Sequence, residues 1–508
     1  MKDTGQWPSE YPRLRELLAE IEDLSIALAI LDWDEQTQMP SSGAQARADQ
    51  KATLEKTIHA KTTDPQIARL LESLMPFEES LPPDADERGL LRMARRQYYL
   101  ATCLPEKLVT DFSRARSRAF RDWLSAREKK DFGAYLDSFQ VILDYSIKVG
   151  EALRQGQGQP LEGLLDYSEP GMTLEVMERI FGELKESLTP LVKTISDRLD
   201  TIDDRILYEE YDLKRQWDIG LQGVDAIGFR LDEGRADQSV HPFSTYFSPR
   251  DVRITTRMDP HDFGMSFFAF LHEAGHGHYM QGIPEAYRRS PLAEGASAGM
   301  HESQSRTWEN LVGRSRGFWR HFYPKVRQTF PEHLADFPEE DWYRAVNRVQ
   351  PSLIRVEADE VTYNLHIMIR YELEKSLHAG ALAPRDLAAA WNAKFKEYLG
   401  IEPQNDLEGV LQDIHWTGMV GAAFQSYTLG NVMAVQLYDA AVRQNPQLEE
   451  AFERGDFSGL LAWTRENVHA HGTKFFPQEL IQRATGQELT TAPFLAYIHR
   501  KFGALYDL

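Results

Sequence analysis

Apolar residues recur three and four residues apart through most of the chain, which is the spacing of an amphipathic helix. Residues 11–31 show this spacing first. The pattern breaks over residues 31–40, and Ser41 or Ser42 is expected to cap a second helix that runs to about residue 59. Proline and glycine mark several joints between further predicted helices, at residues 64–74, 84–102, 106–128, 132–155 and 174–200.

Helical spacing fades between residues 216 and 257, where glycine is frequent. Residues 227–230 and 252–257 are the best strand candidates, and the second places Val252, Ile254 and Thr256 on one face. The chain then returns mainly to helix, at residues 292–314, 331–337, 341–349, 353–378, 384–399, 409–415 and 421–444. Residues 1–508 are therefore predicted to form one mainly α unit, with two lobes around a cleft and a small β-sheet.

An apolar stretch, residues 263–282, contains two histidines and a glutamate at the spacing of a metal-binding motif. Residues 263–282 read FGMSFFAFLHEAGHGHYMQG and follow Asp262, a residue suited to cap a helix. His272 and His276 are separated by about 40° of helical rotation, so both imidazoles leave one face. Glu273 lies beside them, within reach of a water on the metal. This H-E-x-x-H spacing predicts a zinc-hydrolase helix, whereas His278 lies about 200° round from His276 and has no part in it.

The third ligand of a catalytic zinc site must come from another segment. Glu302 follows His276 by 26 residues (302 − 276), which leaves room for a loop and a return helix. Glu294 is the rival, and His301 is expected to point elsewhere if Glu302 faces the metal. In such a site Glu273 takes a proton from the attacking water and returns it to the leaving amine. Peptide hydrolysis is the expected reaction.

Composition and charge narrow the possible partners and location. The formal net charge of −21 opposes binding to nucleic acid or to an anionic membrane. Cys103 is the only cysteine, which excludes an internal disulfide and a zinc site built from several cysteines. The N-terminus shows no apolar signal core, and no apolar run reaches the ~18–20 residues that span a bilayer. These features favour a cytoplasmic protein without nucleic-acid or membrane partners.

Six ordered motifs point to a known family. They are H-P-F at residues 241–243, D-x-R-x-T at 251–255, H-E-x-x-H at 272–276, H-E-S-Q at 301–304, I-R-x-x-A-D at 354–359 and G-x-x-Q-D-x-H-W at 409–416. In this order they resemble the motifs of the carboxypeptidase Taq family of zinc metallocarboxypeptidases. Residues 33–40 and 169–173 also resemble segments of the family's N-terminal half, so the resemblance covers nearly the whole chain. No candidate catalytic position departs from the family's motifs.

The resemblance implies a fold and an activity. The fold is almost all helical, like that of neurolysin and angiotensin-converting enzyme, with two halves around a deep groove closed at one end. The activity is removal of single C-terminal residues from peptides with broad side-chain tolerance, by a homodimer. The H-E-S-Q match implies Glu302 as the third zinc ligand, and cobalt is a candidate replacement for zinc.

Two other functions are weighed against a zinc carboxypeptidase. One is a zinc endo-oligopeptidase of the same architecture. The other is a non-catalytic peptide-binding protein whose metal only stabilises the fold. Glu273 argues against this last alternative, because a structural metal site needs no general base.

A carboxypeptidase must recognise a free carboxylate, which arginine binds through two parallel hydrogen bonds. Arg355, in the I-R-x-x-A-D motif, is the first candidate, and an ion pair with Glu357 or Asp359 is its structural alternative. Asp359 is also a candidate to orient a metal-binding histidine. Arg253 is the other candidate clamp, although its place beside Asp251 favours a structural role.

Three more residues are candidates for contact with substrate. His241 and His415 are candidates to bind the peptide backbone or stabilise the oxyanion, although lone histidines are often structural. Tyr427 is either a phenol donor to the oxyanion or an ordinary helix aromatic. Gln412 and Asp413 are expected to hold the loop around His415.

Overall fold

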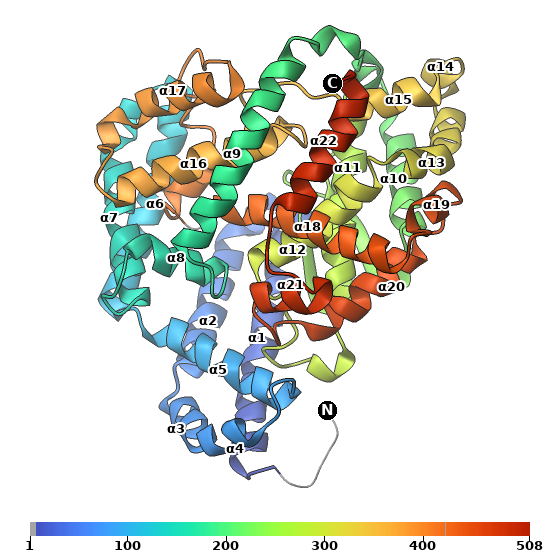
Figure 1. Cartoon of the computed structure of the whole chain (residues 1–508). Helices are drawn as coiled ribbons and strands as arrows, with labels where there is room; N and C mark the ends of the chain where they lie inside the picture. The colour runs from blue at the N-terminus through green and yellow to red at the C-terminus, as the bar shows by residue number, and fades with distance from the viewer. Residues whose placement is uncertain (1–6, 422) are drawn as a thin grey trace. The chain divides into compact units, whose positions relative to one another are not determined.

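The computed structural model describes residues 7–421 and 423–508, and most of them are helical (Figure 1). The chain divides into two compact units. Unit 1 comprises the chain up to Thr102, Arg205–Val346 and Leu437–Gln487. Unit 2 comprises Cys103–Asp204, Asn347–Gln436 and Glu488–Leu508. The predicted class, mainly α with a small sheet, is confirmed.

Unit 1 carries the H-E-x-x-H helix and the sheet. Its helices are α1 (Glu10–Thr37), α2 (Ala44–Thr62), α3 (Pro65–Ser73), α4 (Met75–Ser80), α5 (Asp86–Thr102), α10 (Leu213–Ala226), α11 (Phe263–Gly282), α12 (Ala298–Arg306), α13 (Arg316–Thr329), α14 (Pro331–Leu334), α15 (Glu339–Val346), α19 (Leu448–Glu453), α20 (Ser458–Asn467) and α21 (Pro477–Thr485). A π-helical segment, η7 (Thr307–Val312), continues α12.

α11 has the bounds expected from its sequence, and most of its residues are buried. Asp262 caps it by accepting a hydrogen bond from the Met265 amide at 2.9 Å. Phe267 packs against Trp319 and Phe322 of α13, with ring centroids 5.5 Å away in each case. Because aromatic rings surround its N-terminal half, α11 is held by burial of apolar surface rather than by helix propensity alone.

The sheet lies just before α11 in the chain and packs on it. Its strands are β1 (Gly234–Gln238), β2 (Ser244–Ser248) and β3 (Asp251–Thr256), with β3 central, parallel to β1 and antiparallel to β2. Val252, Ile254 and Thr256 are fully buried, as their alternation predicts. The Thr256 hydroxyl donates to the Ser266 carbonyl of α11 at 3.1 Å, so the sheet braces the helix.

The predicted break at residues 31–40 is wrong, because α1 continues to Thr37. No proline or glycine occurs in this stretch before Pro40, so nothing removes the helical hydrogen bonds. Arg47 of α2 also forms an ion pair with Asp34 at 2.6 Å, which holds this polar part of α1 against α2.

Four other predicted elements differ from the structure. The helix predicted at residues 353–378 begins only at Tyr363, and residues 409–415 form turns that lead into a short 3-10 helix, Ile414–Thr417. Residues 227–230 are not a strand. They form the turn that ends α10, where Gly228 has φ = 89°. Ile227 and Phe229 are apolar because this turn is buried in the core, not because they belong to a sheet. The helix predicted at residues 292–314 begins only at Ala298, where Ser297 caps it, and becomes π-helical at Thr307.

Unit 2 is built from helices. They are α6 (Glu106–Lys129), α7 (Leu136–Leu153), α8 (Pro160–Ser168), α9 (Leu174–Ser196), α16 (Tyr363–His378), α17 (Leu387–Leu399), the first part of α18 (Phe424–Gln444) and α22 (Ala492–Tyr506). α9 packs on α16, where Phe181 and Tyr371 meet edge to face at 4.7 Å. In α6, Trp123 and Arg127 donate to the Leu411 carbonyl at 3.1 and 2.8 Å, which fixes the chain just before Gln412 and Asp413.

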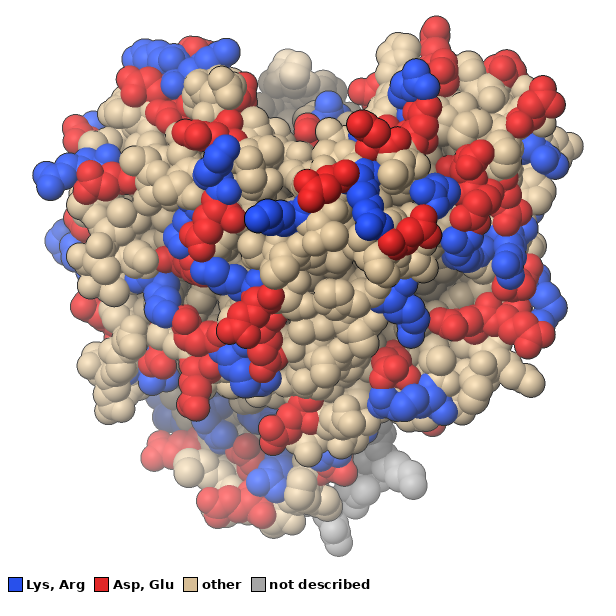
Figure 2. Space-filling view, turned by 45° about the horizontal axis from the view of Figure 1, so that its top comes forward, with Lys and Arg blue, Asp and Glu red and all other residues tan. Residues whose placement is uncertain are grey.

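Charged side chains of both signs are interspersed on the face shown in Figure 2. The sequence has 78 acidic and 57 basic residues, so the excess of negative charge is spread rather than gathered on this face. Within the described part of the chain, every helix is too short or too polar to cross a membrane.

Candidate active site

α11 and α12 bring His272, His276 and Glu302 together. The Nε2 atoms of the two histidines lie 3.7 and 3.5 Å from the same oxygen, Oε2 of Glu302. One ligand atom from each residue lies within 4.8 Å of the others. Two imidazole nitrogens and one carboxylate oxygen form the donor set typical of catalytic zinc. Glu294, the rival candidate, is exposed and lies outside this group.

A glycine lets the two ligand-bearing helices approach closely. A Cβ on Gly275 would lie 2.6 Å from both the Gln304 carbonyl oxygen and the Ser305 Cα. The contact is backbone against backbone, so no flexible side chain can move aside. The spacing of α11 and α12, and with it the distance from His276 to Glu302, therefore depends on this position having no side chain.

Glu309 sets the tautomer of His272. Its Oε2 lies 2.8 Å from Nδ1 of His272. Burial alone would raise the pKa of Glu309, but Arg306, His272 and Arg314 lower that pKa to about 2. The ionised carboxylate can only accept, so Nδ1 of His272 donates and its Nε2 keeps a lone pair directed toward Glu302. Arg306 links the two carboxylates, donating to Glu302 at 2.7 Å and to Glu309 at 3.0 Å.

Glu309 is not among the residues predicted from the sequence, where Asp359 is the candidate for orienting a metal-binding histidine. Asp359 is in unit 2, where its carboxylate accepts from the backbone amides of Gln350, Val361 and Thr362 and from the Thr362 hydroxyl. It holds the turn before α16, and the orienting hypothesis is wrong for it. The available signal was helical spacing, because Glu309 follows Glu302 by seven residues, about two turns along one face.

His276 is oriented by its neighbour His301. Their Nδ1 atoms lie 2.6 Å apart, and His301 lies outside the group of His272, His276 and Glu302, in agreement with the expectation that it points away from the metal. Burial and the proximity of His276 lower the pKa of His301 to about 3, which keeps it neutral. One of the two Nδ1 atoms must carry the proton. If it is that of His276, its Nε2 is free to bind a metal, as His301 accepts the hydrogen bond.

Glu273 lies between the two histidines in sequence and is only 5% exposed. Burial raises the pKa of its carboxyl, although His272 and His276 oppose the shift. A carboxyl with a raised pKa is well suited to take up a proton and give it back near neutral pH. His278 lies outside the metal-binding group, with its ring 4.8 Å from that of Trp308 in the core.

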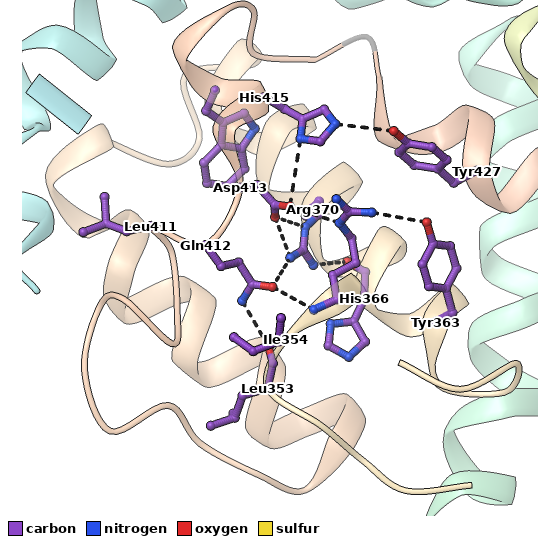
Figure 3. Close-up of polar contacts among 12 residues, drawn as sticks. Leu353, Ile354, Tyr363, His366, Arg370, Leu411, Gln412, Asp413, His415 and Tyr427 are labelled. Carbon is purple, nitrogen blue, oxygen red and sulfur yellow. Dashed lines mark hydrogen bonds and ion pairs between the residues drawn. The ribbon is translucent and has the colours of Figure 1, made fainter. Parts of the chain in front are cut away.

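Unit 2 holds a second polar cluster, built on Asp413 (Figure 3). Arg355 is 7% exposed and donates from Nε to Asp413 at 3.0 Å and from Nη1 to the Tyr363 hydroxyl at 3.2 Å. Its guanidinium also lies over the Tyr427 ring, 5.3 Å from the centroid. The alternative ion pairs with Glu357 or Asp359 are not formed, because Asp413, from a distant part of the sequence, occupies this position.

His415 and Tyr427 meet in the same cluster. His415 Nε2 lies 3.4 Å from the Tyr427 hydroxyl, and His415 Nδ1 lies 3.9 Å from Asp413 (Figure 3). The Gln412 side chain accepts from the Arg355 amide at 3.0 Å and donates to the Leu353 carbonyl at 3.0 Å. Gln412 and Asp413 thus hold the loop before His415, as predicted from the sequence.

Two other candidates lie in unit 1. His241 is exposed in the loop between β1 and β2. Arg253 of β3 forms a two-pronged ion pair with Asp251 at 3.0 and 3.1 Å and lies 4.2 Å from the centroid of the Trp33 ring. These contacts give Arg253 a structural role and leave Arg355 as the stronger candidate for binding a carboxylate.

A known family matches the sequence that forms this site. The match includes the H-E-x-x-H helix, Glu302 and the Asp413 cluster. Residues 13–502 match the family described as carboxypeptidase Taq (M32) metallopeptidase. The chain belongs to this family. The M32 match covers almost the entire sequence, so it includes both the metal-binding group and the Asp413 cluster.

Curated and solved M32 relatives align over nearly their full lengths. Thermostable carboxypeptidase 1 of Thermus thermophilus is 41% identical over 504 residues, covering 98% of this chain and 99% of that protein. Carboxypeptidase 1 of Bacillus subtilis is 36% identical, covering 97% and 98%. The crystal structure of the M32 carboxypeptidase from Deinococcus radiodurans R1 superposes with a TM-score of 0.95 at 41% identity, covering 99% of this chain and all of that one. The protein is therefore a metallocarboxypeptidase, a peptide hydrolase that depends on a divalent metal.

Proposed function

We propose that this metallocarboxypeptidase holds zinc through His272, His276 and Glu302. The residues fit the ion, because both histidine Nδ1 atoms are engaged and both Nε2 atoms are directed toward one carboxylate oxygen. When bound, zinc would supply Lewis acidity to a water and to the scissile carbonyl. Cobalt has similar ligand preferences and is expected to replace zinc.

Glu273 is the proposed general base. Its carboxylate accepts the proton of the attacking water and then delivers that proton to the leaving nitrogen. Its burial supports this role, because desolvation raises the pKa of the carboxyl and so eases the return of the proton.

Arg355 is the proposed receptor for the substrate's C-terminal carboxylate, and it favours peptides with an unblocked C-terminus. His415 and Tyr427 are proposed to bind the end of the peptide, since both lie in the same cluster as Arg355. His241 is proposed as a further contact with the peptide backbone. By the family resemblance we propose broad side-chain tolerance, a homodimer and, from the single cysteine, a cytoplasmic location.

The proposal is tested by comparing three glutamate variants for bound zinc and for release of a C-terminal amino acid. Glu273→Gln should keep its zinc and lose at least about 100-fold in turnover. Glu302→Gln should lose both zinc and turnover, because it removes an anionic ligand. Glu294→Gln, the matched control, should keep both. Zinc retained by Glu302→Gln and lost from Glu294→Gln would overturn the ligand set.

A further inference from the structure

Asp413 is a single carboxylate shared by two arginines (Figure 3). Arg355 donates to its Oδ1 at 3.0 Å, and Arg370 of α16 donates from Nε to its Oδ2 at 2.6 Å. Gln412 joins the same pair, because its side-chain oxygen accepts from Arg370 Nη2 at 2.8 Å and from the Arg355 amide at 3.0 Å. The position of Arg355 is thus fixed through two residues that both contact Arg370.

Arg370 is too deeply buried to contact a substrate. Its side chain is 0% exposed, and its guanidinium lies 4.6 Å from the centroid of the Trp391 ring. Nη1 also donates to the His366 carbonyl one turn earlier in α16 at 2.8 Å. Any effect of Arg370 on peptide binding must therefore pass through Asp413, Gln412 and Arg355.

The cluster carries more positive than negative charge. Burial lowers the pKa of Arg370 to about 10, so Arg370 remains charged near neutral pH. The two arginines hold the pKa of Asp413 at about 2 in spite of burial, so this carboxylate remains ionised. Glu374, one turn further along α16, accepts from the Trp416 indole at 2.7 Å, and burial raises its pKa to about 7. It therefore offsets the excess positive charge only in part at neutral pH.

A buried excess charge is costly unless an opposite charge completes it. If Asp413 faced Arg355 alone, the two would form a neutral pair with little attraction left for a further anion. With Arg370 on the other side of Asp413, the pair of arginines exceeds Asp413 by one positive charge, which Glu374 offsets only in part. A substrate carboxylate is an anion of the charge that the cluster lacks.

We propose that Arg370 is a positioning residue for carboxylate recognition. Its charge balances that of Asp413, so the positive charge of Arg355 remains available to attract the C-terminal carboxylate of the peptide. The proposal rests on the proposed function of Arg355. It assigns to Arg370 an effect on KM rather than on the chemical step, because the side chain of Arg370 is fully buried and cannot touch the substrate.

The test compares kcat and KM for one peptide and for its C-terminally amidated twin. In Arg370→Gln the amide can still donate to Asp413, but the charge is gone. We expect KM for the free peptide to rise roughly 10- to 100-fold with kcat changed only a few-fold, and cleavage of the amidated twin to stay the same. In Arg370→Lys the charge remains, and the preference for the free peptide should stay within a few-fold of wild type.

Arg348→Gln is the matched control, because Arg348 pairs with Asp204 in unit 2 and is 21% exposed. It should leave the preference for the free peptide unchanged. The proposal is overturned if Arg370→Gln keeps the wild-type preference, or if it loses kcat for both peptides equally. Should Arg370→Gln fail to fold, Arg370→Lys decides, since loss of the preference in that charged variant contradicts the proposal and its retention supports it.

Arg355→Gln separates this inference from the function on which it rests. If Arg355→Gln loses the preference while Arg370→Gln keeps it, only the role of Arg370 is wrong. If Arg355→Gln itself keeps the preference, the proposed carboxylate receptor is wrong, and the inference about Arg370 falls with it.

Discussion

Glu309 connects a single hydrogen bond to the function of the metal site. Its ionised carboxylate accepts from His272 Nδ1 and leaves Nε2 as the ligand atom. Glu309→Gln keeps the shape of the side chain but weakens its hold on the protonated Nδ1. We expect zinc to bind about 10- to 100-fold more weakly, because partners that orient a metal-binding histidine typically contribute this much. Equilibrium competition with a chelator measures the change.

The control for Glu309→Gln is Glu340→Gln, which removes another glutamate–arginine pair of unit 1, with Arg316 on the surface. Its zinc affinity should equal that of wild type. Equal affinities in all three proteins would contradict the orienting role of Glu309.

Glu374 predicts how stability changes with pH. Burial raises the pKa of its carboxyl from 4.5 to about 7 in the folded protein. Because the folded pKa is the higher one, the stabilisation is complete below pH ~4.5 and is lost as the pH rises through 7. The loss amounts to about 3 kcal/mol at higher pH. Thermal unfolding at pH 5 and pH 8 should therefore differ less in Glu374→Gln than in wild type.

Glu186→Gln, on the exposed surface of α9, is the control for this pH effect. It should follow the wild-type pH dependence. If Glu374→Gln also follows it, the carboxyl of Glu374 does not titrate in this range.

At the scale of single residues, the sequence predicted what lies within one local pattern. The i, i+4 spacing predicted that His272 and His276 share a face, and the structure brings Glu302 to them. The partners were not predictable in the same way. The contact of Arg355 with Asp413 joins segments 58 residues apart, and no local periodicity encodes it.

At the scale of elements, the contact between α11 and α12 sets the geometry of the ligands. Gly275→Ala would place a methyl group 2.6 Å from the backbone of α12, so the helices must separate. We expect a loss of roughly 2–4 kcal/mol in stability and weaker zinc binding, because the displacement moves His276 away from Glu302. Denaturant unfolding and chelator competition measure the two effects.

Gly264→Ala in the same helix is the matched control for Gly275→Ala. Its Cβ would meet nothing closer than 3.4 Å, and alanine favours helix over glycine by up to about 1 kcal/mol. Gly264→Ala should leave zinc affinity unchanged and stability equal or higher. Equal behaviour of the two variants would mean that α11 and α12 can separate without cost.

The predictability of elements followed their local signals. α11 was predicted because an N-cap, an apolar run and a terminal glycine agree with one another. β3 was predicted because Val252, Ile254 and Thr256 alternate with polar residues, and these three are buried, although Thr255 on the other face is buried as well. The end of α1 was misplaced because its last turns are polar and are held by contacts with α2, such as Arg47 with Asp34. Residues 227–230 resembled a strand because a buried turn is as apolar as a buried strand.

At the scale of the whole molecule, the family match identifies the activity, and two clusters of side chains offer a chemical explanation for it. The match over residues 13–502 makes the protein a metallocarboxypeptidase. We propose that the group of His272, His276 and Glu302 in unit 1 supplies the hydrolytic chemistry and that the Asp413 cluster of unit 2, through Arg355, recognises a free C-terminus. The single catalytic unit of two lobes and the homodimer stay predictions.

Carboxypeptidase activity is tested most directly by the masses of the products from one unblocked peptide and its amidated twin, each incubated with the zinc-loaded enzyme. We expect a ladder of products from the unblocked peptide, each shorter by one C-terminal residue, and almost no cleavage of the amidated twin. Internal fragments, formed equally from both peptides, would contradict this expectation.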